Sequence, residues 1–224
     1  MDMTHSLLMM EQQVNNKFTT AYDFEGYEET KEPPMDFRRK ERERLKFYRS
    51  GKLKSVYLNE KTPIKTLYGD IEAELVSFYE NGAIKRIFPR YGALSAYWSE
   101  KEEAGITDYI DFYLGGKSFR VRPHNILFYE TGEIRSVTIY NCDTLSVNTK
   151  YGIIRTNIGL SFYKNGEIES IEPAFKTQIE VDGKVIRPFY FLADGMHADH
   201  NSLVFDGNGN IISYYGKDID LKGK

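Results

Sequence analysis

Cysteine, tryptophan and long apolar runs are scarce in this sequence of 224 residues. The single cysteine, Cys142, cannot form an internal disulfide, which points to a reducing compartment and predicts a cytoplasmic protein. No apolar run approaches the roughly 18–20 residues of a membrane-spanning helix. The N-terminus also lacks a basic segment followed by a long apolar one, as a secretory signal would have. We therefore expect a protein that has no membrane partner.

An excess of positive charge is also lacking. The chain has 30 Lys and Arg against 33 Asp and Glu, a net charge of −3, which argues against nucleic acid as a partner. The basic run over residues 38–44 contains Glu41 and Glu43, a mixture typical of a solvated edge.

Motifs of common enzymes are absent. The sequence contains no Gly-x-Ser-x-Gly, no phosphate-binding loop and no dinucleotide fingerprint. No motif beside Cys142 suggests an activated thiolate. We therefore predict no catalytic residue and no cofactor, and favour a protein that is not an enzyme.

Aromatic residues are abundant, with 17 Tyr and 14 Phe, and they recur in a pattern. A phenylalanine, usually followed by tyrosine, precedes a glycine turn and then an apolar segment. Such self-similarity indicates a repeat architecture. The five copies begin at Phe47, Phe78, Phe128, Phe162 and Phe205.

The second copy predicts a β-hairpin whose loop and residue pairing can be written out. Asn-Gly between β-prone segments is a strong signal for a two-residue type I′ loop, in which both residues have positive φ. With Asn81-Gly82 as the loop, Val76 pairs with Ile87, Phe78 with Lys85 and Tyr79 with Ile84. Apolar side chains then lie on both faces, so we expect the sheet to be rolled or covered near its turns.

The spacing of the glycine turns predicts the fold class. It favours an all-β protein, an elongated or curled antiparallel meander of about ten hairpins. A Thr-x-Tyr-Gly segment between hairpins occurs twice, at Thr66 and at Thr149, which divides the repeats into two related halves. We assign residues 46–123 to the first half and 124–224 to the second, preceded by an N-terminal appendage over 1–45. Residues 4–18 of the appendage are expected to form a short helix.

The Phe-Tyr-x-Asn-Gly-x-Ile-x-x-Ile pattern resembles the bacterial MORN-variant repeat, which occurs in proteins that include toxin–antitoxin antitoxins. The five copies cover about a quarter of the chain. The resemblance implies a β-hairpin repeat and an antitoxin-like or immunity-like protein partner. It transfers no catalytic residue, because the repeat has none, and it does not extend to the eukaryotic MORN pattern.

Two polar segments contain residue types that bind metals. His197 and His200 share a segment with Asp194 and Asp199, but two histidines with nearby carboxylates are a weak signature, and we predict a connecting loop and no metal. The segment from Asp206 resembles half of a calcium loop, but it lacks the later glycine and glutamate. Three carboxylates after Trp98 predict a solvated charged loop, namely Glu100, Glu102 and Glu103.

The many tyrosine and phenylalanine residues of the predicted sheet favour a binding function. We predict a protein-binding or scaffolding repeat, because Tyr and Phe bury large areas at low entropic cost. One alternative is a small-ligand or carbohydrate-binding groove. The other is an enzyme or metal-dependent binder centred on His197 and His200. Residues that could line a ligand groove are Tyr97, Trp98, Tyr109 and Tyr113.

Overall fold

The computed structural model describes residues 45–90, 99–189, 198–214 and 217–218. The chain divides into two units, Met1–Phe37 and Arg38–Lys224, and all the described residues belong to the second. The helix predicted over residues 4–18 therefore lies outside the described residues.

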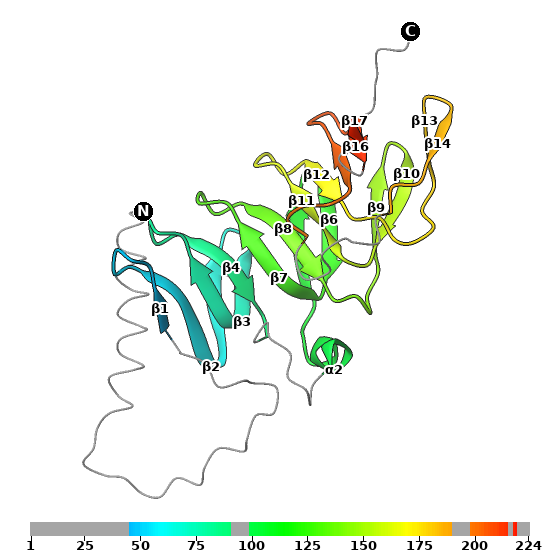
Figure 1. Cartoon of the computed structure of the whole chain (residues 1–224). Coiled ribbons are helices and arrows are strands. Elements are labelled where there is room, and N and C mark those ends of the chain that lie inside the picture. Colours follow the sequence, from blue (N-terminus) through cyan, green and yellow to red (C-terminus); the bar gives the residue numbers. More distant parts are fainter. Residues whose placement is uncertain (1–44, 91–98, 190–197, 215–216, 219–224) are drawn as a thin grey trace, which may run out of the picture. The chain divides into compact units, whose positions relative to one another are not determined.

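One antiparallel sheet of eleven strands forms the framework of the second unit, and its strands follow chain order from blue to red in Figure 1. This confirms the predicted all-β class and its antiparallel meander. Five primary hairpins build the sheet: A (β1–β2), B (β3–β4), C (β7–β8), D (β11–β12) and E (β15–β16). The strands are β1 (Leu45–Phe47), β2 (Leu53–Thr66), β3 (Gly69–Phe78), β4 (Ile84–Phe88), β7 (Pro123–Phe128), β8 (Ile134–Ile139), β11 (Gly159–Phe162), β12 (Ile168–Ile171), β15 (Leu203–Phe205), β16 (Ile211–Tyr214) and β17 (Lys217–Asp218).

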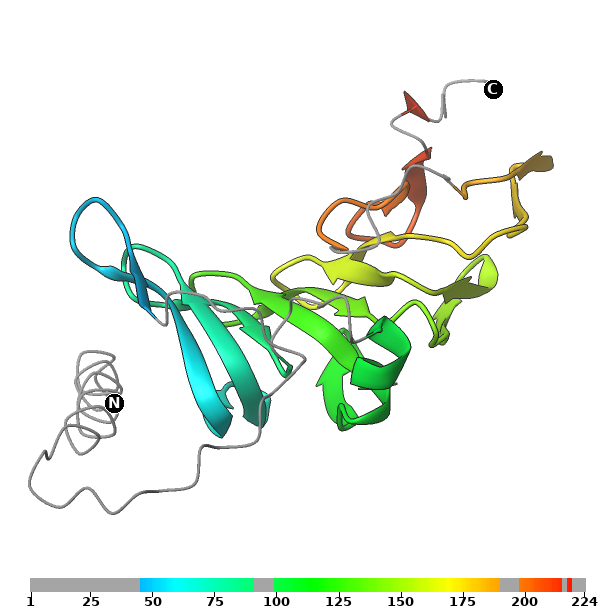
Figure 2. The ribbon, with the colours of Figure 1, turned by 60° about the horizontal axis from the view of Figure 1, so that its bottom comes forward.

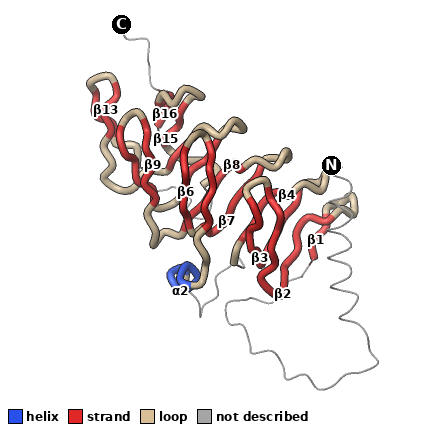
Figure 3. Tube along the Cα trace, turned by 180° about the vertical axis from the view of Figure 1, so that it is seen from behind, coloured by secondary structure: helices blue, strands red, loops and turns tan. Residues whose placement is uncertain are grey.

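A secondary hairpin stands between each two successive primary hairpins. The first is the distal part of β2 and β3, over residues 62–73, where pairing resumes beyond an irregularity. The other three form two-stranded sheets of their own, and β6, β9 and β13 mark them in the rear view of Figure 3. They are β5 (Ile110–Leu114) with β6 (Lys117–Val121), β9 (Leu145–Thr149) with β10 (Gly152–Thr156), and β13 (Ile179–Val181) with β14 (Lys184–Ile186).

Each of the first three secondary hairpins packs on a primary hairpin further along the chain: the first on C, the second on D and the third on E. The course of the chain through these hairpins can be followed by colour in the turned view of Figure 2. Tyr68, at the tip of the first, accepts a hydrogen bond through its hydroxyl from the backbone N–H of Ile134 in hairpin C at 3.3 Å. Tyr151, at the tip of the third, accepts one from Ile211 in hairpin E at 3.1 Å. The second hairpin brings Gly115 against Gly166 in hairpin D, where a Cβ on Gly115 would lie 2.2 Å from the Gly166 carbonyl oxygen. The turns of hairpins C, D and E are therefore covered, as the sequence predicted, whereas the same contacts do not cover hairpins A and B.

Burial of the repeated phenylalanines follows this offset. Phe128, Phe162 and Phe205 belong to the covered hairpins C, D and E and are at most 2% exposed. Phe47 belongs to hairpin A, over which no secondary hairpin of the described residues packs, and it is 56% exposed. The same sequence motif therefore supplies core in one part of the sheet and surface in another.

The turn geometry corrects the predicted type I′ loop. Tyr79 N–H donates to the Ala83 carbonyl at 2.8 Å and Gly82 N–H to the Tyr79 carbonyl at 2.9 Å, so three residues form the loop. Gly82 has φ of 90°, as predicted, whereas Asn81 does not have a positive φ. This is a type I turn followed by a left-handed glycine, and the bulge it produces suits the twist of the strands.

The three-residue loop shifts the pairing next to it. Val76 pairs with Ile87 as predicted, but Phe78 pairs with Ile84 and leaves Lys85 as the extra residue of a bulge. Asn81 still has a local role, because its side-chain oxygen accepts a hydrogen bond from Ala83 N–H at 2.9 Å.

A ladder of tyrosine hydroxyls links the primary hairpins. Tyr48 donates to the Phe78 carbonyl, Tyr79 to Phe128, Tyr129 to Phe162 and Tyr163 to Phe205, at 2.7 to 2.9 Å. Burial raises the pKa of the Tyr79, Tyr129 and Tyr163 hydroxyls, which therefore remain protonated donors at neutral pH. The last copy of the motif has Asp206 in place of tyrosine. Asp206 accepts hydrogen bonds within its own turn, from the backbone N–H groups of Asn208 and Asn210.

Removing one hydroxyl of the ladder should measurably destabilise the protein. We expect Tyr129→Phe to lower the free energy of unfolding by about 1 kcal/mol, because the Phe162 carbonyl loses this donor in a partly buried place. Urea denaturation measures the effect, with Tyr113→Phe as the control, since Tyr113 is exposed. Equal midpoints for the two variants would contradict a stabilising ladder.

The two faces of the sheet differ in chemistry. One register row is apolar across five primary hairpins, and it contains Val76, Ile126 and Leu160. The neighbouring row points to the other face and is rich in serine: Ser55, Ser77, Ser136, Ser161, Ser170 and Ser213.

The segment 198–201 lies across the serine-rich face. Ala198 N–H donates to Thr138 Oγ1 at 2.8 Å, and Asn201 donates to Ser170 Oγ at 2.8 Å. Asp199 forms an ion pair with Arg86 of β4 and accepts a hydrogen bond from Ser136. This segment therefore connects hairpins B, C and D.

A short helix, α2 (Glu100–Gly105), corrects the predicted charged loop. Ser99 Oγ accepts from Glu102 N–H at 3.3 Å, and the Glu102 carboxylate accepts from Ser99 N–H at 2.8 Å. This capping box satisfies two of the unpaired backbone donors at the start of the helix. Glu103 is buried and accepts a hydrogen bond from the Tyr140 hydroxyl at 3.1 Å, rather than facing solvent. Burial raises the pKa of Tyr140.

No helix among the described residues is long and apolar enough to cross a membrane.

Candidate functional site

The outer face of the β5–β6 hairpin gathers exposed side chains of the types found in binding sites. Tyr109 immediately precedes β5 and is 49% exposed, and Tyr113 on β5 is 67% exposed. Side chains alternate between the faces of a strand, so residues 109, 111 and 113 share one side. On β6, Ser118 pairs with Tyr113 and Arg120 with Asp111. We call this surface the β5–β6 patch: Tyr109, Asp111, Tyr113, Ser118 and Arg120.

The inner face of the same hairpin anchors the patch to the sheet. Phe112 and Phe119 stack with their ring centroids 5.1 Å apart. Both meet the ring of Phe162 edge-on, at 6.3 and 5.3 Å. Phe112 also meets Tyr68 of the first secondary hairpin, at 6.4 Å. These aromatic contacts hold the hairpin against hairpin D, so the exposed side chains stand on a packed base.

Charged side chains surround Tyr109. Arg120 and Arg122 place their guanidinium carbons 5.2 and 5.1 Å from the centroid of the Tyr109 ring. Arg120 also binds the Asp111 carboxylate at 3.0 Å, in a pair whose two side chains are 67% and 65% exposed. Arg122 donates from Nε to Asp143 at 2.9 Å, and hydrogen bonding to this carboxylate raises the pKa of the guanidinium.

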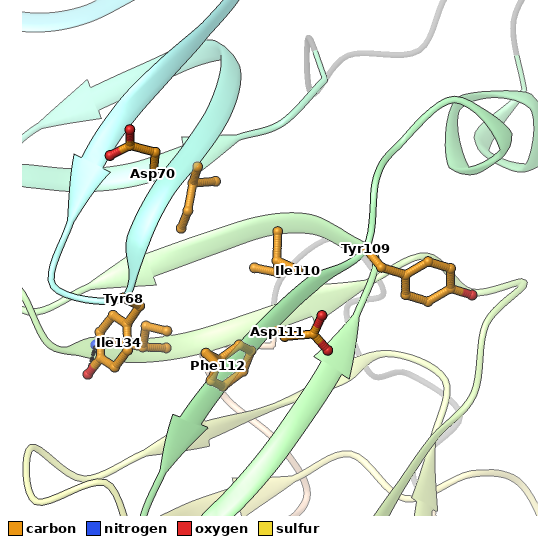
Figure 4. Close-up of a pocket in the computed structure, with 8 residues that line it drawn as sticks. Tyr68, Asp70, Tyr109, Ile110, Asp111, Phe112 and Ile134 are labelled. Atoms are coloured by element: carbon orange, nitrogen blue, oxygen red, sulfur yellow. Dashed lines mark hydrogen bonds between the residues drawn. The ribbon is translucent and has the colours of Figure 1, made fainter.

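A pocket of about 230 Å³ opens beside the patch, between the first secondary hairpin and β5. Figure 4 shows Tyr68 and Ile134 close together on one side, Ile110 and Phe112 on β5, and the Tyr109 ring pointing away from Tyr68. Two acidic residues, Asp70 and Asp111, are also among the lining residues, and Figure 4 shows their carboxylates pointing in different directions. The lining consists of Tyr68, Asp70, Ile71, Tyr109, Ile110, Asp111, Phe112 and Ile134.

The structure brings together two of the four aromatic residues proposed from the sequence. Tyr109 and Tyr113 belong to the patch, whereas Tyr97 and Trp98 lie outside the described residues. Sequence reasoning missed Tyr68, Asp70 and Ile134, because they reach the pocket only through the packing of the first secondary hairpin on hairpin C. The duplicated Thr-x-Tyr-Gly tip was the only signal that could have indicated Tyr68.

The histidines form no metal centre among the described residues, where no group of three or more metal-ligating side chains occurs. His197 lies outside those residues, and His200 is exposed. Asp199, its proposed companion, binds Arg86 and Ser136 instead. His124 is buried, with its ring edge-on to Phe88 and Tyr140 at 6.1 and 5.4 Å.

In comparisons with known proteins, no family model, no curated protein and no solved structure matches the chain.

Proposed function

We propose that this chain is a non-enzymatic protein-binding repeat module and that the β5–β6 patch is its contact surface. The observation that carries the proposal is the group of exposed Tyr109, Tyr113 and Arg120 side chains beside a pocket. Tyrosine and arginine dominate the energetically important positions of protein interfaces. Each tyrosine contributes a large rigid surface, because it loses few rotamers on binding.

The base beneath the patch also suits an interface. The stacked rings of Phe112 and Phe119 hold the hairpin in place before any partner binds, so little ordering cost falls on association. The resemblance to the MORN-variant repeat adds an expectation about the partner. In this proposal it is another protein, in the manner of an antitoxin or immunity pair.

A groove for a drug-sized ligand or an oligosaccharide is the second candidate. Pockets for such molecules usually enclose roughly 300–1,000 Å³. The pocket here encloses about 230 Å³, which suits one side chain of a larger partner better. The exposed rings of Tyr109 and Tyr113 could still stack on a sugar, so glycan binding is an outcome that the experiment must separate.

Site-specific photo-crosslinking tests the proposal. A photoreactive phenylalanine replaces Tyr113 in the full chain, and the control carries it at Val185, which is 61% exposed on β14. In extracts of the native cell we expect one discrete protein adduct from position 113, none from position 185, and loss of the adduct with Arg120→Glu.

Affinity measurements with the purified partner complete the test. Tyr113→Ala is expected to weaken the dissociation constant at least about 10-fold, as for a residue of an interface centre, and Val185→Ala to leave it unchanged. Absence of an adduct, or equal affinities for the two variants, would overturn the protein-binding assignment. A carbohydrate in place of the protein would favour the second candidate.

A further inference from the structure

We infer that a row of cations on the serine-rich face binds an extended acidic segment of a partner protein. The row consists of one side chain from each of hairpins A, B and C, and we call it the cation row: Lys54, Lys85 and Arg135. It lies on the face opposite to the one on which the β5–β6 hairpin packs, because Phe162, which that hairpin contacts, alternates along β11 with Ser161 of the serine-rich face. The inference is therefore independent of the β5–β6 patch.

The row occupies one position of the structural repeat. In each primary hairpin the second strand has one extra residue, in a bulge beside the turn. This residue is Lys54 in hairpin A, Lys85 in B and Arg135 in C. One further strand lies between each two of them, so the row places a positive charge every two strand spacings, about 9–10 Å. The turns beside the row lie along one edge of the sheet in Figure 1.

The ladder tyrosines hold the row in place. Each of these tyrosines follows the motif phenylalanine directly, so it points to the serine-rich face. Each cation lies over the tyrosine ring of its own hairpin, 5.5 to 5.7 Å from the centroid. The three pairs are Lys54 on Tyr48, Lys85 on Tyr79 and Arg135 on Tyr129. The rings are fixed by their hydroxyl hydrogen bonds, so the cations are oriented before a ligand arrives, and a neutral ring leaves their charge uncompensated.

The charge around the row favours an acidic ligand at hairpins A to C. No carboxylate of the described residues forms an ion pair with a row cation. Hairpin A adds positive charge, because Lys46 and Lys52 lie beside Tyr48 on the same face and are exposed. The row ends at hairpin D, where the bulge residue is Glu169. An acidic segment is thus attracted over three hairpins and repelled at the fourth.

The spacing of the row fits an extended polypeptide. In the polyproline II conformation every third residue points to the same side, about 9.3 Å further along, so one carboxylate reaches each cation. A DNA strand in a duplex carries a charge about every 3.4 Å, and most of its phosphates would have no cation beside them. They would also meet Glu80 and Glu130 in the turns of hairpins B and C, which are both exposed. The row therefore suits a protein segment better than nucleic acid.

The chain itself holds a carboxylate next to the row. Asp199, in the segment that lies across the serine-rich face, forms an ion pair with Arg86 and accepts a hydrogen bond from Ser136. Arg86 directly follows Lys85 in the sequence, and Ser136 directly follows Arg135. An acidic side chain on a segment that crosses hairpins B and C is therefore a mode of binding that this face already shows.

Peptides test the inference without the partner. Nuclear magnetic resonance titration of the full chain follows the backbone amides of residues 52–54, 84–85 and 134–135. The ligand is a peptide of three Glu-Pro-Pro repeats, which favours polyproline II and carries a carboxylate at every third position. One control has three Lys-Pro-Pro repeats, and the other has the same composition as the ligand with its three glutamates adjacent. We expect saturable shifts with the ligand, at least about 3-fold weaker binding of the clustered peptide and no binding of the lysine peptide.

Variants locate the response. Neutralising the row with Lys54→Gln, Lys85→Gln and Arg135→Gln together should weaken the glutamate peptide at least about 10-fold. A matched control neutralises three exposed lysines elsewhere and has the same net charge: Lys101→Gln, Lys176→Gln and Lys184→Gln. It should change the affinity less than about 2-fold, because salt screens distant charges. If the row variant is less stable in urea, Lys54→Gln alone should still weaken binding at least about 2-fold.

Several results would overturn the inference. They are equal losses in the two triple variants, equal binding of the glutamate and lysine peptides, and equal binding of the clustered peptide. Tighter binding of a thymidine oligonucleotide than of the glutamate peptide, lost in the row variant, would assign the row to nucleic acid instead. The titration needs no partner and no residue of the β5–β6 patch, so its result and that of the crosslinking experiment stand separately.

Discussion

Gly159→Ala is expected to lower the free energy of unfolding by about 3 kcal/mol or more. A Cβ at position 159 would lie 2.0 Å from the Val137 carbonyl oxygen and 2.8 Å from Ala198 Cβ. The Val137 oxygen belongs to the strand β8 that pairs with β11, so it cannot move without disturbing the ladder. The residue also has φ of 147°, which L-amino acids rarely adopt.

Substitutions of two further glycines separate the cost of steric overlap from the cost of backbone strain. Gly152 has φ of 95°, but an added Cβ would have nothing within 4 Å, so Gly152→Ala should cost only the backbone strain, about 1–2 kcal/mol. Gly207 has neither constraint, and Gly207→Ala should change stability by less than about 0.5 kcal/mol. Urea denaturation of the three variants measures the series. A Gly159→Ala value no larger than that of Gly152→Ala would show that β11 does not approach β8 and Ala198 this closely.

Asp199→Ala is expected to destabilise the protein by about 2–4 kcal/mol. Arg86 is only 11% exposed and Asp199 20% exposed, so the substitution takes the Asp199 carboxylate away from a largely buried guanidinium. Ser136 loses this acceptor in the same change. The segment 198–201 would then be held on the serine-rich face by fewer contacts, and hairpins B and C would lose a bridge between them.

The matched control is an exposed ion pair. Asp111→Ala removes the carboxylate that binds Arg120, where both side chains are about two-thirds exposed, and should cost less than about 1 kcal/mol. A double-mutant cycle with Arg86→Met isolates the coupling between Arg86 and Asp199. Similar losses from Asp199→Ala and Asp111→Ala would contradict a structural role for the buried pair.

The fifth copy of the motif differs from the others at the ladder position. Each ladder tyrosine needs a carbonyl of the following hairpin, and the last motif copy lacks tyrosine at this position. Asp206 instead satisfies the N–H groups of its own turn. Aspartate at this position therefore replaces a contact between hairpins with contacts inside one turn.

Local chemistry determined the class of fold. The Phe-Tyr pairs before glycine turns predict hairpins because a turn and its flanking strands interact within about ten residues, and the structure contains a hairpin at each of the five copies. Local preference did not settle the loop length. Asn81-Gly82 suits a two-residue loop as well as a three-residue one, and the structure has the three-residue loop.

The candidate site was decided by contacts between residues far apart in the sequence. Tyr109 and Tyr113 could be proposed from their type alone, whereas Tyr68, Asp70 and Ile134 join them only because each of the first three secondary hairpins packs on the primary hairpin two places ahead. The sequence by itself therefore determined a chain of β-hairpins rich in tyrosine. Only the tertiary structure decided which of those hairpins are covered and where a pocket opens, because that offset is made by contacts between residues far apart in the sequence, such as Phe112 and Phe119 on Phe162, which no local turn preference specifies.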